Sequence, residues 1–191
     1  MISDLVATSR HDTVDALLDA FSDAADKADI KAYFGCFHSA ACRFLGTDPA
    51  ENWTVSDFYT FAKPHFDKGR AWTYVPVAGS RKCDSPLPGT PGVVVFDELL
   101  TSKSFQCTCR GSGTAYFDTG SRSWFLLQYH LSFAIANDIA AAVCGVQGKF
   151  ERKGSASMSA ASAEEELLKL LALEDSANQR EKPKKGTSKK K

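Results

Sequence analysis

No run of apolar residues in this sequence approaches the roughly 20 that a membrane-spanning helix needs. Residues 1–10 contain no apolar stretch of the kind that forms a secretory signal, so we expect none. Neither charge is in excess, since 23 Lys and Arg balance 23 Asp and Glu, which removes the general reason to expect nucleic acid. The six cysteines lack zinc-binding spacing, and we expect them to be reduced thiols of a cytoplasmic protein.

The sequence also lacks the motifs that mark the common catalytic and cofactor-binding sites. It has no GxSxG turn, no P-loop, no GxGxxG after a strand and no Ser-His-Asp order. We therefore expect no cofactor and no metal ion, and the balance favours a protein that is not an enzyme. Isomerases and lyases without a metal stay open, because side chains alone can carry out their proton transfers.

The chain of 191 residues is long enough for one domain and an appendage. Its composition changes sharply after Phe150, where small polar residues replace the mixed apolar pattern. Leucines then recur at helical spacing behind three glutamates, which predicts a short amphipathic helix. The expected segments are an N-terminal arm (1–12), a globular domain (13–150), a flexible linker (151–163), the amphipathic helix (164–174) and a basic disordered tail (175–191).

The tail at 175–191 holds seven Lys and Arg against two Asp and Glu, a net charge of +5. Such a run is typical of a solvated, disordered segment. It also fits contact with RNA or another acidic partner, or a nuclear-import signal. We expect a cytoplasmic protein, with entry into the nucleus through this tail as the alternative.

The apolar periodicity of the globular part changes from helical to strand-like along the chain. Three segments carry the helical pattern: 13–28, 29–37 and 55–67. Five carry strand patterns: 41–45, 71–82, 92–101, 104–117 and 122–135. A turn at 118–121 joins the last two strands as a hairpin. Helices followed by a run of antiparallel strands predict an α+β domain, with the helices packed on one face of a sheet.

Several short motifs, in this order, resemble those of one family. They are Phe44-Leu-Gly46-Thr47-Asp48-Pro-Ala-Glu51-Asn-Trp53, Pro64-His65-Phe66 followed by Trp72-Thr-Tyr74, Phe96-Asp97-Glu98-Leu99, Trp124-Phe-Leu-Leu-Gln128-Tyr-His130-Leu-Ser132-Phe, and Asn137-Asp138. Their order and spacing from residue 13 to residue 138 are similar to those of SnoaL-like domains in the nuclear transport factor 2-like superfamily.

This resemblance implies a cone-shaped domain with three N-terminal helices packed on a strongly curved, mostly antiparallel sheet. The helices and the sheet enclose a pocket in such domains, which often form homodimers through the sheet. The superfamily includes ketosteroid isomerases, polyketide cyclases and dehydratases, and also proteins that only bind partners. The fold therefore does not choose between an enzyme and an interaction module.

Strand alternation sorts the candidate site residues in the last strand, 122–135. Gln128, His130 and Ser132 share one face, and the SnoaL-like resemblance matches them to a polar set that faces the pocket. A buried sheet rarely places three consecutive polar side chains inward, since each needs a partner. We therefore expect them to form the polar wall of a cavity, with a core histidine bonded to a neighbour as the alternative for His130.

Asp97 and Glu98 are neighbours in one strand, so only one of them points inward. A carboxylate in an apolar pocket can act as a general acid or base. Together with His130 it would support an isomerase or dehydratase, and these three residues are the catalytic candidates. Arg110 on the adjacent strand is expected to pair with the inward carboxylate, and a structural ion pair is the alternative.

Trp53, Trp72 and Tyr74 are the expected apolar walls of the cavity, with core packing as the alternative. Asp48 and Glu51, just before Trp53, supply too few oxygens for a cation, which favours a cap or a salt bridge. The ligand-binding candidates are Trp53, Trp72, Tyr74, Arg110, Gln128 and Ser132. The sequence thus predicts a pocket domain that binds a small apolar or amphipathic molecule, serves as a dimeric interaction module, or both.

Overall fold

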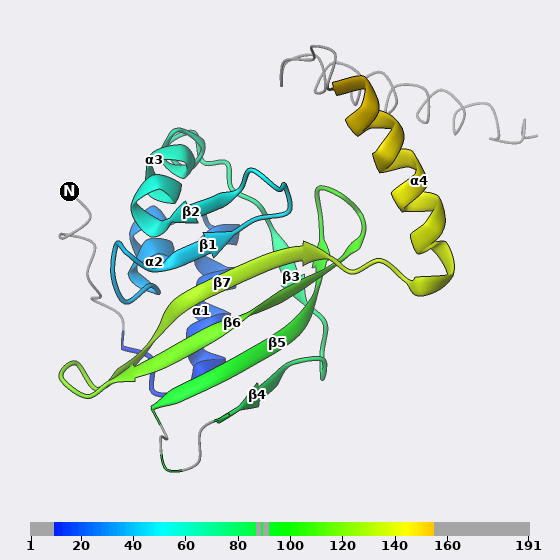
Figure 1. Cartoon of the computed structure of the whole chain (residues 1–191). Helices are drawn as coiled ribbons and strands as arrows, with labels where there is room; N and C mark the ends of the chain where they lie inside the picture. The colour runs from blue at the N-terminus through cyan, green and yellow to red at the C-terminus, as the bar shows by residue number, and fades with distance from the viewer. Residues whose placement is uncertain (1–9, 87–88, 90–91, 155–191) are drawn as a thin grey trace, which may run out of the picture. The chain divides into compact units, whose positions relative to one another are not determined.

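The structure is a computed structural model that describes residues 10–86, 89 and 92–154 (Figure 1). The chain divides into two compact units after Ile135. The second unit contains helix α4 (Asn137–Gly154), so the expected linker start at residue 151 falls inside a helix. The amphipathic helix predicted at 164–174 and the basic tail at 175–191 lie outside the described residues. In the described part, no helix is both long and apolar enough to cross a membrane.

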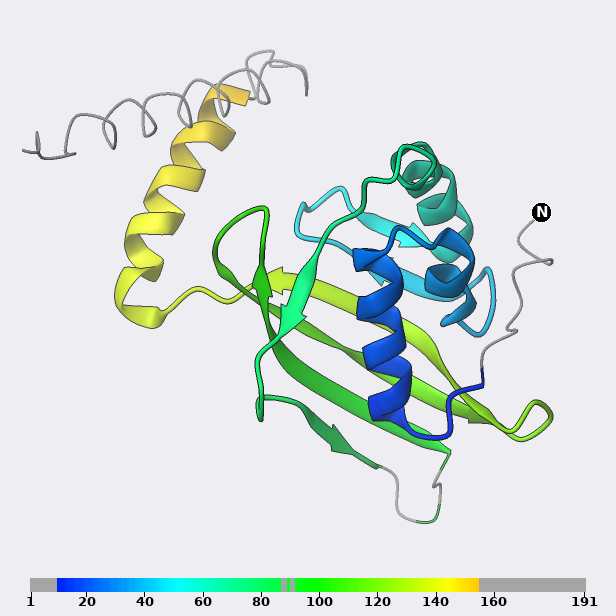
Figure 2. The ribbon, with the colours of Figure 1, turned by 180° about the vertical axis from the view of Figure 1, so that it is seen from behind.

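Three helices of the first unit pack on one face of its sheet (Figure 2). They are α1 (Val14–Asp26), α2 (Ile30–Gly35) and α3 (Val55–Phe66). Each begins at a residue whose side-chain oxygen accepts a hydrogen bond from a backbone N–H of the first turn: Thr13, Asp29 and Thr54. Capping and apolar spacing are local features, so all three helices lie where the sequence predicts them.

The sheet is mixed but mostly antiparallel, in the order β2-β1-β7-β6-β5-β3, with β4 also paired to β5. Among the pairings of the described strands only β1–β7 is parallel, and an isolated parallel bridge also joins Phe37 to Leu126 of β7. The strands are β1 (Arg43–Leu45), β2 (Asn52–Thr54), β3 (Tyr74–Pro76), β4 (Lys82–Asp84), β5 (Val93–Ser102), β6 (Thr108–Asp118) and β7 (Ser123–Phe133). Helices on one face of a curved antiparallel sheet confirm the predicted α+β class.

The single strand predicted at 71–82 is instead two short strands on the same edge of β5. β3 pairs at Ser102–Leu100 and β4 pairs at Asp97–Val95, both antiparallel. Gly79 between them has φ +75°, a conformation that glycine adopts without strain. The Ser80 hydroxyl fills the gap in the ladder, because it accepts a hydrogen bond from Leu99 N at 3.0 Å.

β7 contains a bulge that changes which of its side chains face the helices. Thr114 of β6 pairs with Gln128, whereas the next residue, Ala115, pairs with Leu126 and leaves Leu127 as an extra residue. The strand approaches β6 closely at this point. A Cβ on Gly113 would lie 2.1 Å from the Gln128 carbonyl oxygen, so only glycine fits there without a backbone shift.

Candidate functional site

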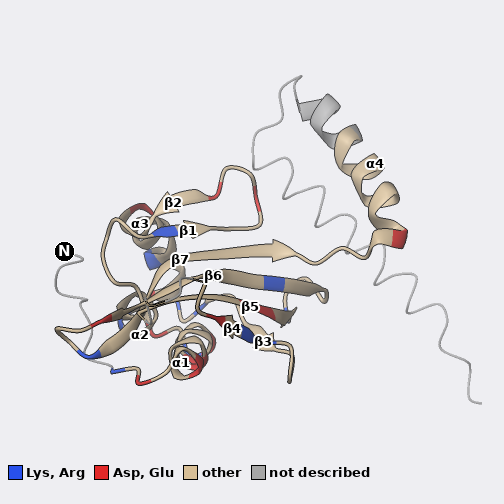
Figure 3. Cartoon of the chain, turned by 60° about the horizontal axis from the view of Figure 1, so that its bottom comes forward, with Lys and Arg blue, Asp and Glu red and all other residues tan. Residues whose placement is uncertain are grey.

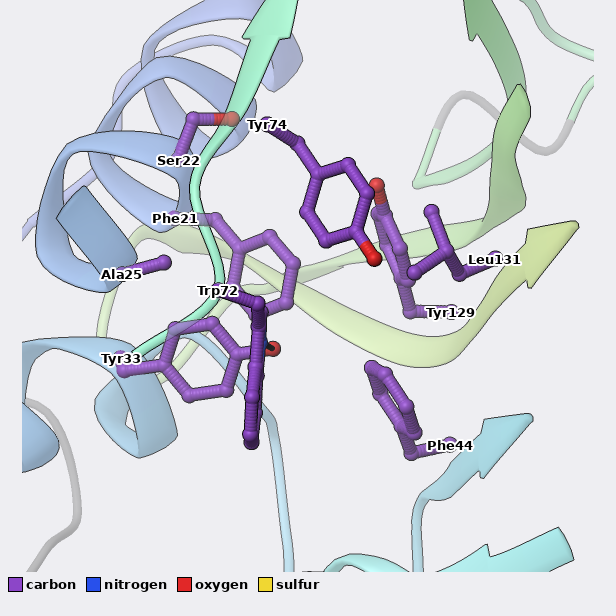
Figure 4. Close-up of a pocket in the computed structure, with 9 residues that line it drawn as sticks. All are labelled: Phe21, Ser22, Ala25, Tyr33, Phe44, Trp72, Tyr74, Tyr129 and Leu131. Carbon is purple, nitrogen blue, oxygen red and sulfur yellow. Dashed lines mark hydrogen bonds between the residues drawn. The ribbon is translucent and has the colours of Figure 1, made fainter. Parts of the chain in front are cut away.

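The space between the helices and the sheet holds two adjacent chambers. The outer chamber has a volume of about 270 Å³. It is lined by Phe44, Gly46, Thr47, Glu51, Trp53, Phe58, Phe61, His65, Trp72, Tyr74, Ser104, Phe105 and Leu131. The inner chamber, of about 20 Å³, is lined by Phe21, Ser22, Ala25, Tyr33, Phe44, Trp72, Tyr74, Tyr129 and Leu131 (Figure 4). The inner chamber has room for about one water molecule, so only the outer one can hold an organic ligand.

Stacked aromatic rings form the main wall of the outer chamber. The Phe58 ring of α3 lies at its centre, 3.8 Å from the Phe44 ring with planes 14° apart. The Trp53 and Trp72 rings stack on Phe58 at 5.4 Å and 5.6 Å between centroids. Their planes are within 25° of that of Phe58. A wall of stacked, nearly parallel rings is apolar and held in place by its own packing, which suits a ligand with an aromatic group.

Tyrosine hydroxyls surround the inner chamber and fix part of this wall. Trp72 Nε1 donates a hydrogen bond to the Tyr33 hydroxyl at 3.3 Å, which orients the indole ring. Burial raises the pKa of Tyr33 and of Tyr129, and it raises the pKa of Tyr74 to about 12. Tyr74 and Tyr129 lie side by side (Figure 4). These hydroxyls stay neutral near pH 7 and supply polar groups without adding charge.

Glu51 and His65 are the ionisable side chains in the outer chamber apart from Tyr74. Glu51 lies at the end of the β1–β2 loop, which Gly46 N closes with a 2.8 Å bond to the Glu51 carbonyl. Its Oε2 accepts a hydrogen bond from Asp48 N at 3.2 Å. A Cβ on Gly46 would lie 1.9 Å from that oxygen, so the glycine makes room for the carboxylate. No group of three or more potential metal ligands occurs among the described residues.

A family model for the SnoaL-like domain matches residues 14–136, which is more than half of the chain. The protein belongs to the SnoaL-like family. Among solved structures, an NTF2-like protein of unknown function from Pseudomonas putida KT2440 is 11% identical with a TM-score of 0.51. The match covers 65% of this chain and 86% of that one.

A second solved structure, described as a “putative dehydratase” from the NTF2-like family of Streptomyces avermitilis, is 9% identical with a TM-score of 0.52. Its match covers 64% of this chain and 94% of that one. At these identities the two structures show a shared fold and nothing finer. A search of curated proteins finds no match. The family and fold of this SnoaL-like domain are therefore shown, and its chemistry has to come from its own residues.

Three predicted site residues of the SnoaL-like domain lie where the sequence placed them. Trp53, Trp72 and Tyr74 all line the outer chamber. They come from β2, from the segment before β3 and from β3 itself. Their contact with a ligand stays a prediction.

The prediction that Gln128, His130 and Ser132 form the polar wall of the cavity is wrong. The buried residues of this part of β7 are Tyr129 and Leu131, which line the chambers, so the three polar side chains face the other side of the sheet. The bulge at Leu127 causes the error, because one extra residue reverses the alternation between Leu126 and Tyr129. The ionisable groups of the outer chamber come from α3, β3 and the β1–β2 loop instead.

Asp97 and Glu98 of β5 point to opposite faces of the sheet, as alternation requires, but their partners differ from the prediction. Asp97 points to the outer face, where it accepts hydrogen bonds from Arg110 Nη1, one of them at 2.7 Å. Glu98 points inward, is 1% exposed, and pairs with Arg81 rather than Arg110. Figure 3 shows charged residues of both signs on the neighbouring strands β4, β5 and β6.

Neither carboxylate lines either chamber, and His130 lies on the outer face. Glu98 and His130 therefore lie on opposite sides of the sheet. Asp97 and His130 share the outer face but are separated by Ser112 of β6, which pairs with both. The structure does not bring the predicted proton-transfer residues together.

The sequence also missed several residues of the chamber, among them Phe61, His65 and Phe105. Phe61 and His65 are four residues apart on α3, with ring centroids 5.5 Å apart. Their spacing was visible in the sequence as one face of a helix. That spacing could not show that the helix face borders a cavity, because a helix face packed in a solid core has the same spacing.

Proposed function

We propose that this SnoaL-like domain binds a small, flat, predominantly apolar molecule in its outer chamber. The observation that carries the proposal is the stacked wall of Phe58, Trp53 and Trp72 beside an unfilled volume of about 270 Å³. Ligand sites are typically concave, mostly apolar and aromatic, with a few polar groups that fix orientation. Glu51, His65 and the Tyr74 hydroxyl are those groups here.

Replacing Trp53 by alanine is expected to weaken binding of 2-naphthol, a flat aromatic probe, by about tenfold or more. Truncating a central aromatic contact typically costs ~2 kcal/mol, and ~1.4 kcal/mol corresponds to tenfold. Isothermal titration calorimetry measures the affinity of each variant. Trp124→Ala is the matched control, because Trp124 is also half-buried but packs on Phe117 outside both chambers. Equal affinities in the two variants would contradict a site at the outer chamber.

The alternative function, an isomerase or dehydratase that uses His130 with Asp97 or Glu98, has less support. A proton-transfer residue must lie within hydrogen-bond reach of the substrate. None of these three side chains lines a chamber in the described structure. The pocket function therefore does not depend on them.

The second candidate function is a homodimeric interaction module, built on the outer face of the sheet. In the first unit the helices cover only the opposite face (Figures 1 and 2). The outer face carries Val95, which is 39% exposed, beside the paired side chains of Asp97 and Arg110. A second copy placed over this face would bury that apolar surface.

Sedimentation velocity at micromolar concentration is expected to give a species of twice the 20.7 kDa of one chain. Val95→Glu is expected to convert that species into monomer, since it places two like charges in the shared surface. Thr101→Glu, which also alters an exposed residue of β5 but near the end of the strand, serves as the control. A wild-type species of 20.7 kDa would refute the dimer.

A further inference from the structure

The outer chamber contains one carboxylate, that of Glu51. Its lining includes Glu51 and no lysine or arginine. Among the described residues, no lysine, arginine or histidine forms an ion pair with Glu51. The β1–β2 loop also carries acidic residues and no basic ones (Figure 3). A ligand that enters the chamber therefore meets a negative potential at the Glu51 end.

The loop holds the Glu51 carboxylate in place rather than leaving it mobile in water. Oε2 accepts the Asp48 N–H at 3.2 Å and lies against the bare backbone of Gly46. One N–H bond uses only part of the acceptor capacity of a carboxylate, which has about four lone-pair sites. The remaining sites of this half-buried group are available to a ligand, and an ionised carboxylate accepts bonds but does not donate them.

The negative charge also acts on the chamber wall. Burial is the largest cause that raises the pKa of Tyr74 to about 12, and the negative charge of Glu51 adds to it. Glu51 is thus electrostatically coupled to a tyrosine that separates the two chambers.

The aromatic residues of the lining complement the same charge. Seven of the thirteen lining residues are Phe, Tyr or Trp. Trp53 stacks on Phe61 at 4.8 Å with planes 24° apart, and on Phe58 with planes 9° apart. The face of an aromatic ring carries negative charge density and attracts cations within about 6 Å of its centroid, with tryptophan the strongest.

We infer that the outer chamber selects a small aromatic molecule that carries a positive charge, such as an arylammonium ion. This inference rests on the proposed function and names the chemical class of its ligand. The aryl group lies against the faces of Trp53 and Trp72, and the cationic group lies toward Glu51. An apolar cavity with a carboxylate and no lysine or arginine disfavours anions, because no permanently cationic side chain offsets their desolvation.

Two probes of nearly identical shape test the charge alone. Phenyltrimethylammonium and tert-butylbenzene differ in that a quaternary nitrogen replaces a quaternary carbon, and neither probe donates an N–H or O–H bond. Isothermal titration calorimetry is carried out on the full chain at about pH 8, where histidine side chains in general are neutral. We expect the cation to bind at least about tenfold more tightly than the neutral probe, the ratio that ~1.4 kcal/mol gives.

Glu51→Gln is expected to remove this preference while leaving the affinity for tert-butylbenzene unchanged, which shows that the chamber is intact. Asp48→Asn is the matched control, since it removes the same charge from the same loop at a residue that does not line the chamber. That variant should keep the preference.

Equal binding of the two probes by the wild type, or a preference that survives Glu51→Gln, would overturn the inference and leave the pocket function standing. Failure of both probes and of 2-naphthol to bind would overturn the proposed function as well.

Discussion

Replacing Arg81 by methionine is expected to lower the free energy of unfolding by about 3–5 kcal/mol, as is usual when one partner of a buried ion pair is removed. Arg81 Nε donates to Glu98 Oε2 at 2.8 Å, and the Glu98 side chain is 1% exposed. The same guanidinium contacts Asp15 and Asp19 of α1 at 3.2 Å and 2.9 Å. The substitution therefore leaves the buried Glu98 carboxylate without its partner. It also removes the ion pairs that link α1 to β5 through Arg81.

Urea denaturation at pH 7 measures this loss. Lys103→Met is the control, because Lys103 also pairs with α1, through Asp26, but both side chains are more than half exposed. An exposed pair contributes about 0–1 kcal/mol. Losses of equal size in the two variants would show that the Arg81–Glu98 pair is energetically no different from a surface pair.

The pH dependence of the Arg81→Met variant provides an independent check. Burial raises the pKa of Glu98, and the hydrogen bond from Arg81 opposes that rise. Without Arg81 the folded-state pKa of Glu98 increases further above the unfolded value of 4.5. A raised carboxyl pKa costs nothing below the unfolded value and destabilises the fold as the pH rises. The stability gap between wild type and variant should therefore be largest near pH 7 and narrow toward pH 4.

The helices could be predicted from the sequence because their information is local. Thr13 and Thr54 each precede an apolar pattern of period 3.6 and accept a backbone N–H of the first turn. The break between β3 and β4 was not visible to the same reasoning. Gly79 in a β-rich segment is compatible with a strand, and only pairing with β5 shows that the chain turns there.

Which side chains of β7 face the helices could not be predicted. The answer depends on Leu127, the extra residue of the bulge, and a leucine at that position does not indicate a bulge. Leu127 is an ordinary strand residue, and unbroken alternation would place Gln128, His130 and Ser132 on the same face as Leu126. The close approach of the two strands beside the bulge depends on a residue of the neighbouring strand. Gly113 lets the Gln128 carbonyl approach so closely that no side chain fits between them.

The ion-pair partner of Glu98 could not be predicted from the sequence either. Arg81 lies 17 residues earlier, outside any regular strand, and reaches Glu98 only because β4 and β3 fold along β5. Trp53, Trp72 and Tyr74 could be predicted as chamber residues because they lie in the motifs that resemble a pocket-forming family. Glu51 could not be predicted as a chamber residue, because its position depends on the geometry of the β1–β2 loop.

Replacing Phe58 by alanine is the substitution expected to affect both stability and binding. Phe58 is 1% exposed, stacks on Phe44 at 3.8 Å, and supports the rings of Trp53 and Trp72. Truncation of a buried phenylalanine to alanine typically costs about 3–5 kcal/mol, from lost transfer energy and the cavity left behind. Without the central ring the two tryptophans lose their common support, so 2-naphthol should bind at least about tenfold more weakly, ~1.4 kcal/mol.

Phe61→Ala on the same helix separates the two effects. Phe61 lines the outer chamber and stacks on Trp53, yet it is 45% exposed. Its truncation should weaken 2-naphthol binding while lowering the free energy of unfolding by no more than about 1 kcal/mol, because little buried surface is lost. Urea denaturation and calorimetry on both variants test this pair of expectations. Similar stability losses at the two positions would contradict this role of Phe58. The buried, stacked ring would then stabilise the fold no more than the half-exposed ring of Phe61 does.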